Sequence, residues 1–401
     1  MLPRQVLNAA LSRVTEGCFK VRYWDGVTEC FGTGEPQFTI HFRDAGALDL
    51  LAGGIENGFS DGYIQGRIEV EGDVADVVAT AMLNVDAARG GLLGKFINTA
   101  VKLQRRRSLD RQKKDVASHY DLGNDFFRLY LDPSMTYSCA YFSGPGDSLE
   151  DAQRRKVDLC LRKLRLKPGE TLLDIGSGWG SAIIRAAEKC GASAFGITLS
   201  EEQLAGSRAF VKERGLEGRV SVALQNYSEL AKEGRTFDKI LSVGMIEHVG
   251  QAHLAEFAAS VERLLAPGGI ALLHHITSPM ADPPARSGED GFTERIFPGT
   301  YIPTLVESLT HLVSNGFRIL NVENLREHYR MTLDRWSDRY EANFDTVRGR
   351  FGDEFARKWR LYLRGCSAAF RVGTCEVHQI LVSKGVTDAV PLTMADVYSQ
   401  G

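Results

Sequence analysis

Residue types suited to chemistry gather around a glycine-rich turn near the middle of the chain. Residues 171–180 read T-L-L-D-I-G-S-G-W-G: a short apolar run ends at Asp174, and Gly176, Gly178 and Gly180 follow. Glycine accepts positive φ and lets a ligand approach where a Cβ would collide, and a strand, a glycine-rich turn and a helix together form a nucleotide-binding corner. The stretch therefore predicts such a corner, and a tight turn with a purely structural role is the alternative.

The spacing of these glycines indicates which ligand the corner holds. G-x-G-x-G differs from the dinucleotide fingerprint G-x-G-x-x-G. An alternate-glycine turn preceded by an acidic residue resembles the turn with which class I methyltransferases hold S-adenosylmethionine, a ligand that has no phosphate to place at a helix N-terminus. We therefore expect S-adenosylmethionine here, with Asp174 and the three glycines among its contacts.

The turn needs a sheet to position it, and the surrounding pattern predicts one. Apolar segments alternate with helical patterns after residue 171, and two further strands come late in the chain. Besides the strand that begins at Thr171, strands are expected at 194–198, 220–224, 237–243, 270–276, 316–322 and 377–382. Seven strands with helical crossovers give an α/β fold, a Rossmann-like doubly wound sheet whose ligands bind at the carboxyl ends of the strands.

Polar residues at those strand ends are candidate contacts of the cofactor. The stretch T-L-S-E-E-Q offers Thr198, Ser200 and Gln203, whose hydroxyls and amide can hydrogen-bond a ribose or an amino-acid group. Ser200, followed by acidic residues, also predicts the N-cap of a helix. Asn226 and Tyr227 follow the next strand, so we expect them at the same edge of the sheet.

Titratable residues at other strand ends predict a second site beside the cofactor. Glu247 follows the fourth strand in V-G-M-I-E-H-V-G, although an E-H pair there could also cap the next helix. His274 and His275 end the fifth strand, where neighbours point to opposite faces, so only one can face the ligand crevice. A histidine alone in this place would be structural more often than catalytic. Cys139 lies in an aromatic-rich stretch that suggests an apolar pocket wall, and Tyr329 alone would look like a core residue of a helix.

Seven motifs in order make the chain similar to the cyclopropane-fatty-acyl-phospholipid synthases and, in its methyltransferase half, to the mycolic acid cyclopropane synthases. They are H-Y-D at 119–121, M-T-Y-S-C-A-Y-F at 135–142, L-D-I-G-S-G-W-G at 173–180, G-I-T-L-S-E-E-Q at 196–203, V-G-M-I-E-H-V-G at 243–250, L-L-H-H-I-T at 272–277 and H-Y-R-M-T-L-D-R-W at 328–336. The resemblance covers residues 116–385. It implies a class I methyltransferase fold, S-adenosylmethionine as cofactor and a phospholipid with an unsaturated acyl chain as substrate.

Carried over residue by residue, the resemblance implies two sets of contacts. The S-adenosylmethionine contacts would be Gly176, Gly178, Thr198, Leu199, Ser200 and Gln203, with Tyr137 and Ser138 closing over the cofactor. A bound bicarbonate ion would lie among Cys139, Glu247, His274, Ile276 and Tyr329. Two residues depart from the family pattern. Ser177 stands where cysteine is usual and is expected to face the turn, and His275 stands where threonine is common and is expected to face away from the ligand.

These residues fit one reaction, the formation of a cyclopropane ring on a cis double bond. An isolated alkene is a weak nucleophile, so the methyl sulfonium must be held against it in a dry cavity. Aromatic rings near Tyr137, Tyr141, Phe142 and Tyr329 can stabilise the carbocation that methyl transfer leaves. Bicarbonate, held by hydrogen bonds, can then remove a proton from the added methyl group so that the ring closes.

Two other functions stay open at this stage. The same methyl transfer could end in a methylene or methyl-branched chain, or in a precursor of furan fatty acids, if the proton leaves another carbon. A catalytically idle lipid-binding or carrier protein that keeps the fold belongs to another class, and fold alone does not exclude it. The presence together of Cys139, Glu247, His274 and Tyr329 argues against that idle protein.

The remaining length predicts two accessory parts before the methyltransferase domain at 116–401. A chain of 401 residues fits one large and one small domain. Residues 1–84 alternate with period two at 19–24 and 37–42, which indicates a small α+β domain. The resemblance, weaker in this part, implies that it is an accessory lipid-contacting domain.

The predicted linker at 85–115 carries a basic amphipathic helix. Residues 90–107 place apolar side chains at helical spacing together with Lys95, Lys102 and three consecutive arginines, Arg105 to Arg107. Such a segment suits the surface of an anionic bilayer. A solvated linker helix that packs on the other domain is the alternative.

Composition limits the compartment and the partners. The formal net charge of −3 gives no general basic excess, which argues against nucleic acid as a partner. Seven scattered cysteines without a C-x-x-C pair are expected to be reduced thiols, and no metal-ligand spacing is present. The N-terminal stretch lacks the apolar core of a signal peptide. We expect a cytoplasmic protein that associates peripherally with the inner face of the membrane, and the sequence leaves open whether it forms a homodimer.

Overall fold

The computed structural model describes residues 4–84, 122–279 and 300–398, and these form two compact units. Of the described residues, one unit contains 122–279, 300–332 and 375–398. The other contains 4–84 and Leu333–Thr374. Each unit has its own sheet. The linker helix predicted at 90–107 lies outside the described residues.

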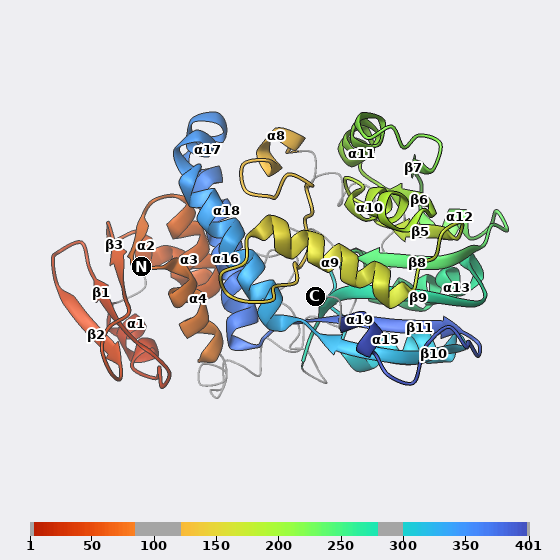
Figure 1. The fold of residues 1–401 in the computed structure, drawn as a ribbon. Helices are drawn as coiled ribbons and strands as arrows, with labels where there is room; N and C mark the ends of the chain where they lie inside the picture. The colour runs from red at the N-terminus through yellow and green to blue at the C-terminus, as the bar shows by residue number, and fades with distance from the viewer. Residues whose placement is uncertain (1–3, 85–121, 280–299, 399–401) are drawn as a thin grey trace. The chain divides into compact units, whose positions relative to one another are not determined.

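A seven-stranded sheet forms the centre of the larger unit. Its strands are β5 (Thr171–Ile175), β6 (Ser193–Thr198), β7 (Val220–Leu224), β8 (Phe237–Val243), β9 (Leu265–Thr277), β10 (Phe317–Asn324) and β11 (Glu376–Lys384), arranged in the order β10-β11-β9-β8-β5-β6-β7 (Figure 1). The five strands from β9 to β7 in that order run parallel, and β11 runs antiparallel to both of its neighbours. All seven predicted strands are present, and the predicted fold class is confirmed.

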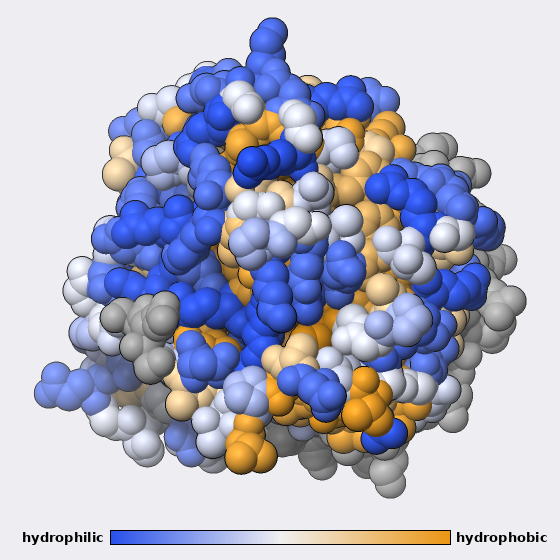
Figure 2. Space-filling view, turned by 45° about the vertical axis from the view of Figure 1, so that its right-hand side comes forward, coloured by the Kyte–Doolittle hydropathy of each residue, from blue (hydrophilic) through white to orange (hydrophobic). Residues whose placement is uncertain are grey.

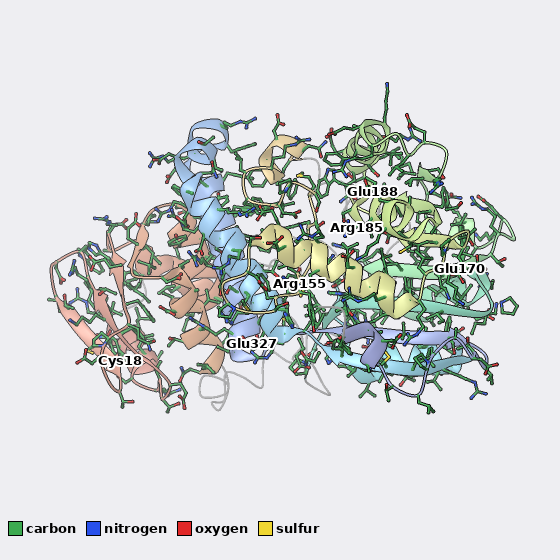
Figure 3. All side chains as sticks on the ribbon, in the orientation of Figure 1. Cys18, Arg155, Glu170, Arg185, Glu188 and Glu327 are labelled. Atoms are coloured by element: carbon green, nitrogen blue, oxygen red, sulfur yellow. The ribbon has the colours of Figure 1, made fainter. Side chains whose placement is uncertain are left out.

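Helices cover both faces of this sheet because successive strand residues point to opposite sides. Leu172 packs in one apolar cluster with side chains of α9 (Leu149–Leu164), α10 (Ser181–Cys190) and α11 (Glu201–Glu213). Leu173 packs in another with α12 (Tyr227–Leu230), α13 (Leu254–Leu264) and α15 (Leu305–Ser314). Figure 1 shows α9 crossing in front of the strands. An ion pair fixes α9 to α10: Arg185 Nε, on the side chain labelled in Figure 3, lies 2.8 Å from Asp158 Oδ1.

Short elements between the strands bring polar residues to the carboxyl edge of the sheet. The single turns η2 (Ile246–His248) and η3 (Gln251–His253) follow β8, and α8 (Asn124–Phe127) precedes the aromatic-rich loop that leads to α9. After β10 the long helix α16 (Arg326–Ala342) begins in the larger unit, and α19 (Ala395–Tyr398) is the last described helix.

The smaller unit is built on a four-stranded sheet in the order β2-β1-β3-β4. Its strands are β1 (Cys18–Arg22), β2 (Thr28–Gly32), β3 (Phe38–Phe42) and β4 (Ile68–Glu71), and its helices before residue 84 are α1 (Arg4–Leu11), α2 (Ala47–Leu50), η1 (Leu51–Gly53), α3 (Ile55–Ile64) and α4 (Val74–Leu83). Strands were predicted at 19–24 and 37–42, where β1 and β3 lie. The pattern missed the other two strands because β2 is largely exposed and β4 has only four residues.

Two helices from late in the chain complete the smaller unit: α17 (Phe344–Phe351) and α18 (Asp353–Val372). Ala368 of α18 packs against Ala75 and Ala79 of α4. Arg357 is 8% exposed and donates hydrogen bonds to the carbonyls of Tyr63 and Ile68. This grouping differs from the sequence division, which placed all residues after 116 in one domain. The boundaries at 84 and 116 themselves stay predictions.

Polar and apolar side chains are interspersed on the face seen in Figure 2. Within the described ranges, no helix has both the length and the apolar character needed to cross a membrane.

Candidate active site

A pocket opens at the carboxyl ends of β5, β6, β7 and β8, and it encloses about 1050 Å³ of empty space when its open mouth is included. Ten of the twelve residues predicted to contact the cofactor line it: Tyr137, Ser138, Asp174, Gly176, Gly178, Thr198, Leu199, Gln203, Asn226 and Tyr227. The two others, Gly180 and Ser200, are not part of the lining but cap the helices α10 and α11 that begin beside it. The structure therefore gathers the predicted contacts at one place.

The three glycines of the turn serve different needs. All have positive φ, at 82° for Gly176, 54° for Gly178 and 89° for Gly180. A Cβ on Gly176 would lie 2.8 Å from the Met245 side chain, and one on Gly180 would lie 2.4 Å from Ser207 Oγ. A Cβ on Gly178 would meet no protein atom within 4 Å, so this backbone is open toward the pocket. The turn is thus packed tightly against the protein at Gly176 and Gly180 and is accessible from the pocket at Gly178, as a ligand-binding turn requires.

The polar residues after β6 form a small hydrogen-bonded frame. Thr198 Oγ1 donates to Gln203 Oε1 at 2.7 Å, and the backbone N–H of Gln203 donates to Ser200 Oγ at 3.2 Å. Ser200 thereby caps α11, and the predicted N-cap is confirmed. Its role is to hold Gln203 and Thr198 at the pocket edge.

The side chain of Asn226 caps a helix with its oxygen and leaves its amide nitrogen as a hydrogen-bond donor. Its Oδ1 accepts the N–H of Ser228 at 2.8 Å and caps α12, whereas its buried Nδ2 has no hydrogen-bond partner among the described residues. A buried amide donor without a partner is costly unless a ligand completes it. This donor, the open backbone at Gly178 and the apolar walls of Trp179, Met245 and Val249 fit S-adenosylmethionine.

Glu247 and His274 are a second group of buried polar residues, at neighbouring strand ends that are joined through backbone groups. Glu247 Oε1 accepts the backbone N–H of Ile276 at 2.7 Å, and the carbonyl of His274 accepts the N–H of Gly244 at 2.8 Å. Both side chains are at most 5% exposed. Among the described residues, neither Glu247 Oε2 nor His274 Nε2 has a hydrogen-bond partner, and both atoms are buried, so each is left to bond a small polar ligand.

Burial shifts the pKa values of Glu247 and His274 and so determines their charges near pH 7. It raises the pKa of Glu247 to about 7, although the hydrogen bond from Ile276 opposes the shift. Burial also lowers the pKa of His274 well below its usual value, with Lys156 adding to the effect. His274 is therefore neutral near pH 7, and Glu247 takes up or releases a proton there, as a group that handles protons should.

The two adjacent histidines near the end of β9 face opposite sides, as predicted. His274 Nδ1 lies 3.1 Å from Gln379 Nε2 of β11. His275 lines a different and mostly apolar cavity with Phe257 and Leu273. The departure from the family pattern at His275 thus lies outside the lining of the cofactor pocket.

Cys139 is held in a buried loop by α16. The N–H of Ala140 donates to Thr332 Oγ1 at 2.9 Å, and the N–H of Phe142 donates to His328 Nδ1 at 3.1 Å. The Cys139 thiol is fully buried and donates to the carbonyl of Ala140 at 3.2 Å. Burial raises the pKa of this thiol far above its usual range, so Cys139 stays protonated.

Tyr329 lies on the first turns of the same helix. The carbonyl of Leu325 accepts the Tyr329 N–H at 3.0 Å and lies 3.9 Å from Cys139 Sγ. This shared carbonyl brings the start of α16 to the Cys139 loop. The residues that hold the loop, Thr332 and His328, carried no sequence signal beyond their place in the last motif.

Sequence reasoning also missed pocket residues contributed by α9 and the loops. Lys156 and Gln225 line the pocket, and Gln153 supports the loop above it with hydrogen bonds to the carbonyls of Thr136 and Ser138. The amphipathic pattern of α9 could have flagged Lys156, which is only 3% exposed and, with Gln153 and Lys163, is one of three polar residues on the buried face of this helix.

Comparison with known proteins identifies the family. The sequence profile described as mycolic acid cyclopropane synthetase matches residues 107–380. The chain belongs to the mycolic acid cyclopropane synthetase family, whose members are S-adenosylmethionine-dependent methyltransferases. A domain family of unknown function matches residues 6–89.

Relatives of this cyclopropane synthetase family differ in how much of the chain they match. A probable fatty acid methyltransferase of Pseudomonas putida is 36% identical over 386 residues, which are 94% of this chain and 96% of that protein. Cyclopropane mycolic acid synthase 1 of Mycobacterium tuberculosis is 37% identical over 281 residues, 67% of this chain and 96% of its own. The solved structure of the cyclopropane synthase MmaA2 from Mycobacterium tuberculosis superposes with a TM-score of 0.64 at 36% identity, covering 68% of this chain and 98% of that one. Cyclopropane synthase CmaA1, solved with S-adenosylhomocysteine and CTAB, gives a TM-score of 0.63 at 36% identity, with the same two coverages.

Proposed function

We propose that this protein transfers a methylene group from S-adenosylmethionine to the cis double bond of an unsaturated phospholipid acyl chain and so forms a cyclopropane ring. The observation that carries the proposal is that two buried atoms, Glu247 Oε2 and His274 Nε2, have no hydrogen-bond partner among the described residues and lie at the edge of the sheet that also forms the cofactor pocket. A simple methyl transfer to a nucleophile needs no such cluster. Removal of a proton from the added methyl group does.

The residues of the pocket would bind and orient the cofactor. Thr198, Gln203, Asn226 and the backbone at Gly178 would hold it, and bound S-adenosylmethionine supplies an electrophilic methyl group. Tyr137 closes the pocket as part of an aromatic group, its ring 5.3 Å from that of Phe127. Such rings exclude water and stabilise positive charge that develops on the substrate.

The second cluster would hold bicarbonate and direct the loss of the proton. Bicarbonate fits the unpartnered atoms there, since neutral His274 can donate from Nε2 and Glu247, with its pKa near 7, can share a proton with an anion. Cys139, Ile276 and Tyr329 would complete the site, and bound bicarbonate supplies the base. The Ile276 N–H is engaged by Glu247 and would help by fixing that carboxyl group.

Mass spectrometry of the lipid product tests this proposal. The protein is incubated with S-adenosylmethionine and vesicles of a monounsaturated phospholipid, and we expect each modified acyl chain to gain one CH2. Proton NMR of the product should show the upfield signals of a strained ring. Transfer only to a soluble acceptor, or no transfer in the presence of bicarbonate, would overturn the assignment.

A second candidate is transfer that ends in a methyl-branched or methylene chain. The observation that favours it is the match over nearly the whole chain to a probable fatty acid methyltransferase, whereas the mycolic acid synthases match about two thirds of it. Olefinic or methyl signals in the same NMR spectrum, without ring signals, would select this candidate.

We also infer that the protein works at the inner face of the membrane as a peripheral protein. The proposed substrate is an acyl chain within a bilayer, and residues 95–107 of the sequence carry five basic side chains. Basic segments of this kind bind anionic lipid surfaces.

A further inference from the structure

Two side chains of opposite charge face the cofactor pocket, and neither forms an ion pair with another described residue. Lys156 of α9 and Asp174 at the end of β5 both line the pocket, and each is 3% exposed. The Lys156 Nζ donates one hydrogen bond, to Ser138 Oγ at 2.9 Å, and among the described residues no carboxylate oxygen lies within 4.0 Å of it. The Asp174 carboxylate has no hydrogen bond or ion pair to any described side chain.

A second buried lysine on the same helix has its charge balanced by a carboxylate. Lys163 is fully buried, and its Nζ forms an ion pair with Glu323. A buried ammonium group without such a partner costs free energy, and so does a buried carboxylate. Lys156 and Asp174 interact only at longer range: the lysine charge lowers the pKa of Asp174, but burial outweighs it and raises that pKa to about 7.

A ligand that carries one negative and one positive charge could pair with Lys156 and Asp174 at the same time. An α-amino acid end has a carboxylate and an ammonium group on one carbon, and charge-assisted hydrogen bonds to each are stronger than neutral ones. We propose that Lys156 binds the carboxylate of the amino-acid end of S-adenosylmethionine, opposite Asp174, which receives its ammonium group. The inference deepens the cofactor site of the family and does not depend on which lipid is modified.

The surroundings of Lys156 support a binding role over a purely structural one. Its neighbour on the helix, Gln153, already ties down the covering loop through the carbonyls of Thr136 and Ser138. Lys156 adds one bond to the Ser138 hydroxyl and keeps its remaining N–H groups for a ligand. Lys156 lines this pocket whereas Glu247 and His274 do not, which favours the cofactor carboxylate as its anion. The Lys156 charge also acts on the pKa of His274, so bicarbonate is the competing anion that the titrations below distinguish.

Calorimetric titration of the full chain with three ligands tests the proposal. S-adenosylhomocysteine carries the whole amino-acid end, its decarboxylated analogue keeps only the amine, and 5′-methylthioadenosine lacks both groups. We expect Lys156→Met to weaken S-adenosylhomocysteine roughly 10- to 100-fold, the size of a lost hydrogen bond between charged groups. The same variant should bind the other two ligands as the unmodified protein does.

Lys163→Met is the matched control, because it removes a buried lysine of the same helix that does not line the pocket. It should leave the affinities for all three ligands unchanged, with circular dichroism confirming the fold. If Lys156→Met does not fold, Lys156→Gln, which keeps a polar group toward Ser138, takes its place in the same titrations.

Three outcomes would overturn the proposal. Equal weakening of all three ligands by Lys156→Met would make the lysine a support of the Ser138 loop. Unchanged affinity for S-adenosylhomocysteine would remove the lysine from the site. Competition by bicarbonate with S-adenosylhomocysteine in the unmodified protein, absent in Lys156→Met, would assign the anion site to bicarbonate. A failure of the unmodified protein to bind any of the three would instead count against the cofactor assignment.

Discussion

At the scale of single residues, the cofactor contacts and the proton-handling residues differ in what surrounds them. Thr198 and Gln203 bond to each other, so they are already held in place before a ligand arrives. Glu247 and His274 each keep a buried polar atom without a partner. The first arrangement favours binding, and the second favours chemistry on a small group that enters with the substrate.

Glu247→Gln and His274→Ala should separate these two sites. We expect each to lower kcat at least 100-fold, because general acid–base groups contribute roughly 10²- to 10⁴-fold, while S-adenosylhomocysteine affinity stays nearly unchanged. Calorimetry and product formation on the same preparations measure both quantities. Glu256→Gln, at an exposed position of α13, is the control and should keep full turnover. A loss of cofactor affinity as large as the loss of turnover would show that the two sites are one.

Cys139→Ser should keep substantial activity. The thiol is buried, protonated and bonded to a backbone carbonyl, and an electron-rich alkene offers no electrophilic carbon for a thiolate. A serine hydroxyl can donate to the same carbonyl, so we expect kcat to fall less than tenfold. Intact-protein mass spectrometry during turnover serves as the control. An acyl adduct on Cys139, or activity as low as that of Glu247→Gln, would require a covalent mechanism.

At the scale of elements, the residues at the strand ends could be predicted from the sequence, whereas the residues that reach the site from other helices and strands could not. The glycine turn, the cap at Ser200 and the opposite orientation of the two histidines follow from local rules of backbone geometry. Thr332 and Gln379 reach the site from a helix and a strand far along the sequence, and no local pattern connects them with it. Lys156 lies closer, on α9, where its place on an amphipathic helix was the one local signal. Tertiary packing alone decides which side of an amphipathic helix faces a ligand.

The cap of α11 can be tested by itself. Ser200→Ala removes the hydroxyl that accepts the Gln203 N–H, and we expect the free energy of unfolding to fall by about 1 kcal/mol. S-adenosylhomocysteine affinity should fall as well, because Gln203 loses its fixed position at the pocket. Urea unfolding and calorimetry measure the two effects. Ser200→Asp restores an oxygen at the cap and should recover most of the stability; no difference between the alanine and aspartate variants would contradict the capping role.

At the scale of the whole molecule, the larger unit follows the predicted α/β order, and the smaller unit has a composition that the sequence did not reveal. Its core combines α4 with α18, more than 250 residues apart, through alanine packing and the buried Arg357. Contacts between distant segments leave little trace in a single sequence. The family of unknown function that matches residues 6–89 covers the N-terminal part of this unit.

Membrane association is expected to depend on ionic strength. Binding to vesicles that contain anionic lipid should weaken as salt rises from about 0.05 to 0.5 M, because the Debye length falls over that range. Sedimentation with vesicles measures it, and neutral vesicles are the control. A variant with Arg105, Arg106 and Arg107 changed to Gln should bind more weakly at low salt. Sedimentation that salt does not affect, or equal binding to neutral vesicles, would contradict an electrostatic association.

The fate of the transferred methyl group tests the central claim most directly. S-adenosylmethionine that carries a trideuterated methyl group is incubated with the protein and vesicles of a monounsaturated phospholipid, and the product is analysed by mass spectrometry and NMR. We predict a saturated ring carbon that retains two of the three deuterium atoms, because the third leaves as the ring closes. A product that keeps all three deuterium atoms, or one that shows an olefinic carbon in place of the ring, would contradict cyclopropane formation by this protein.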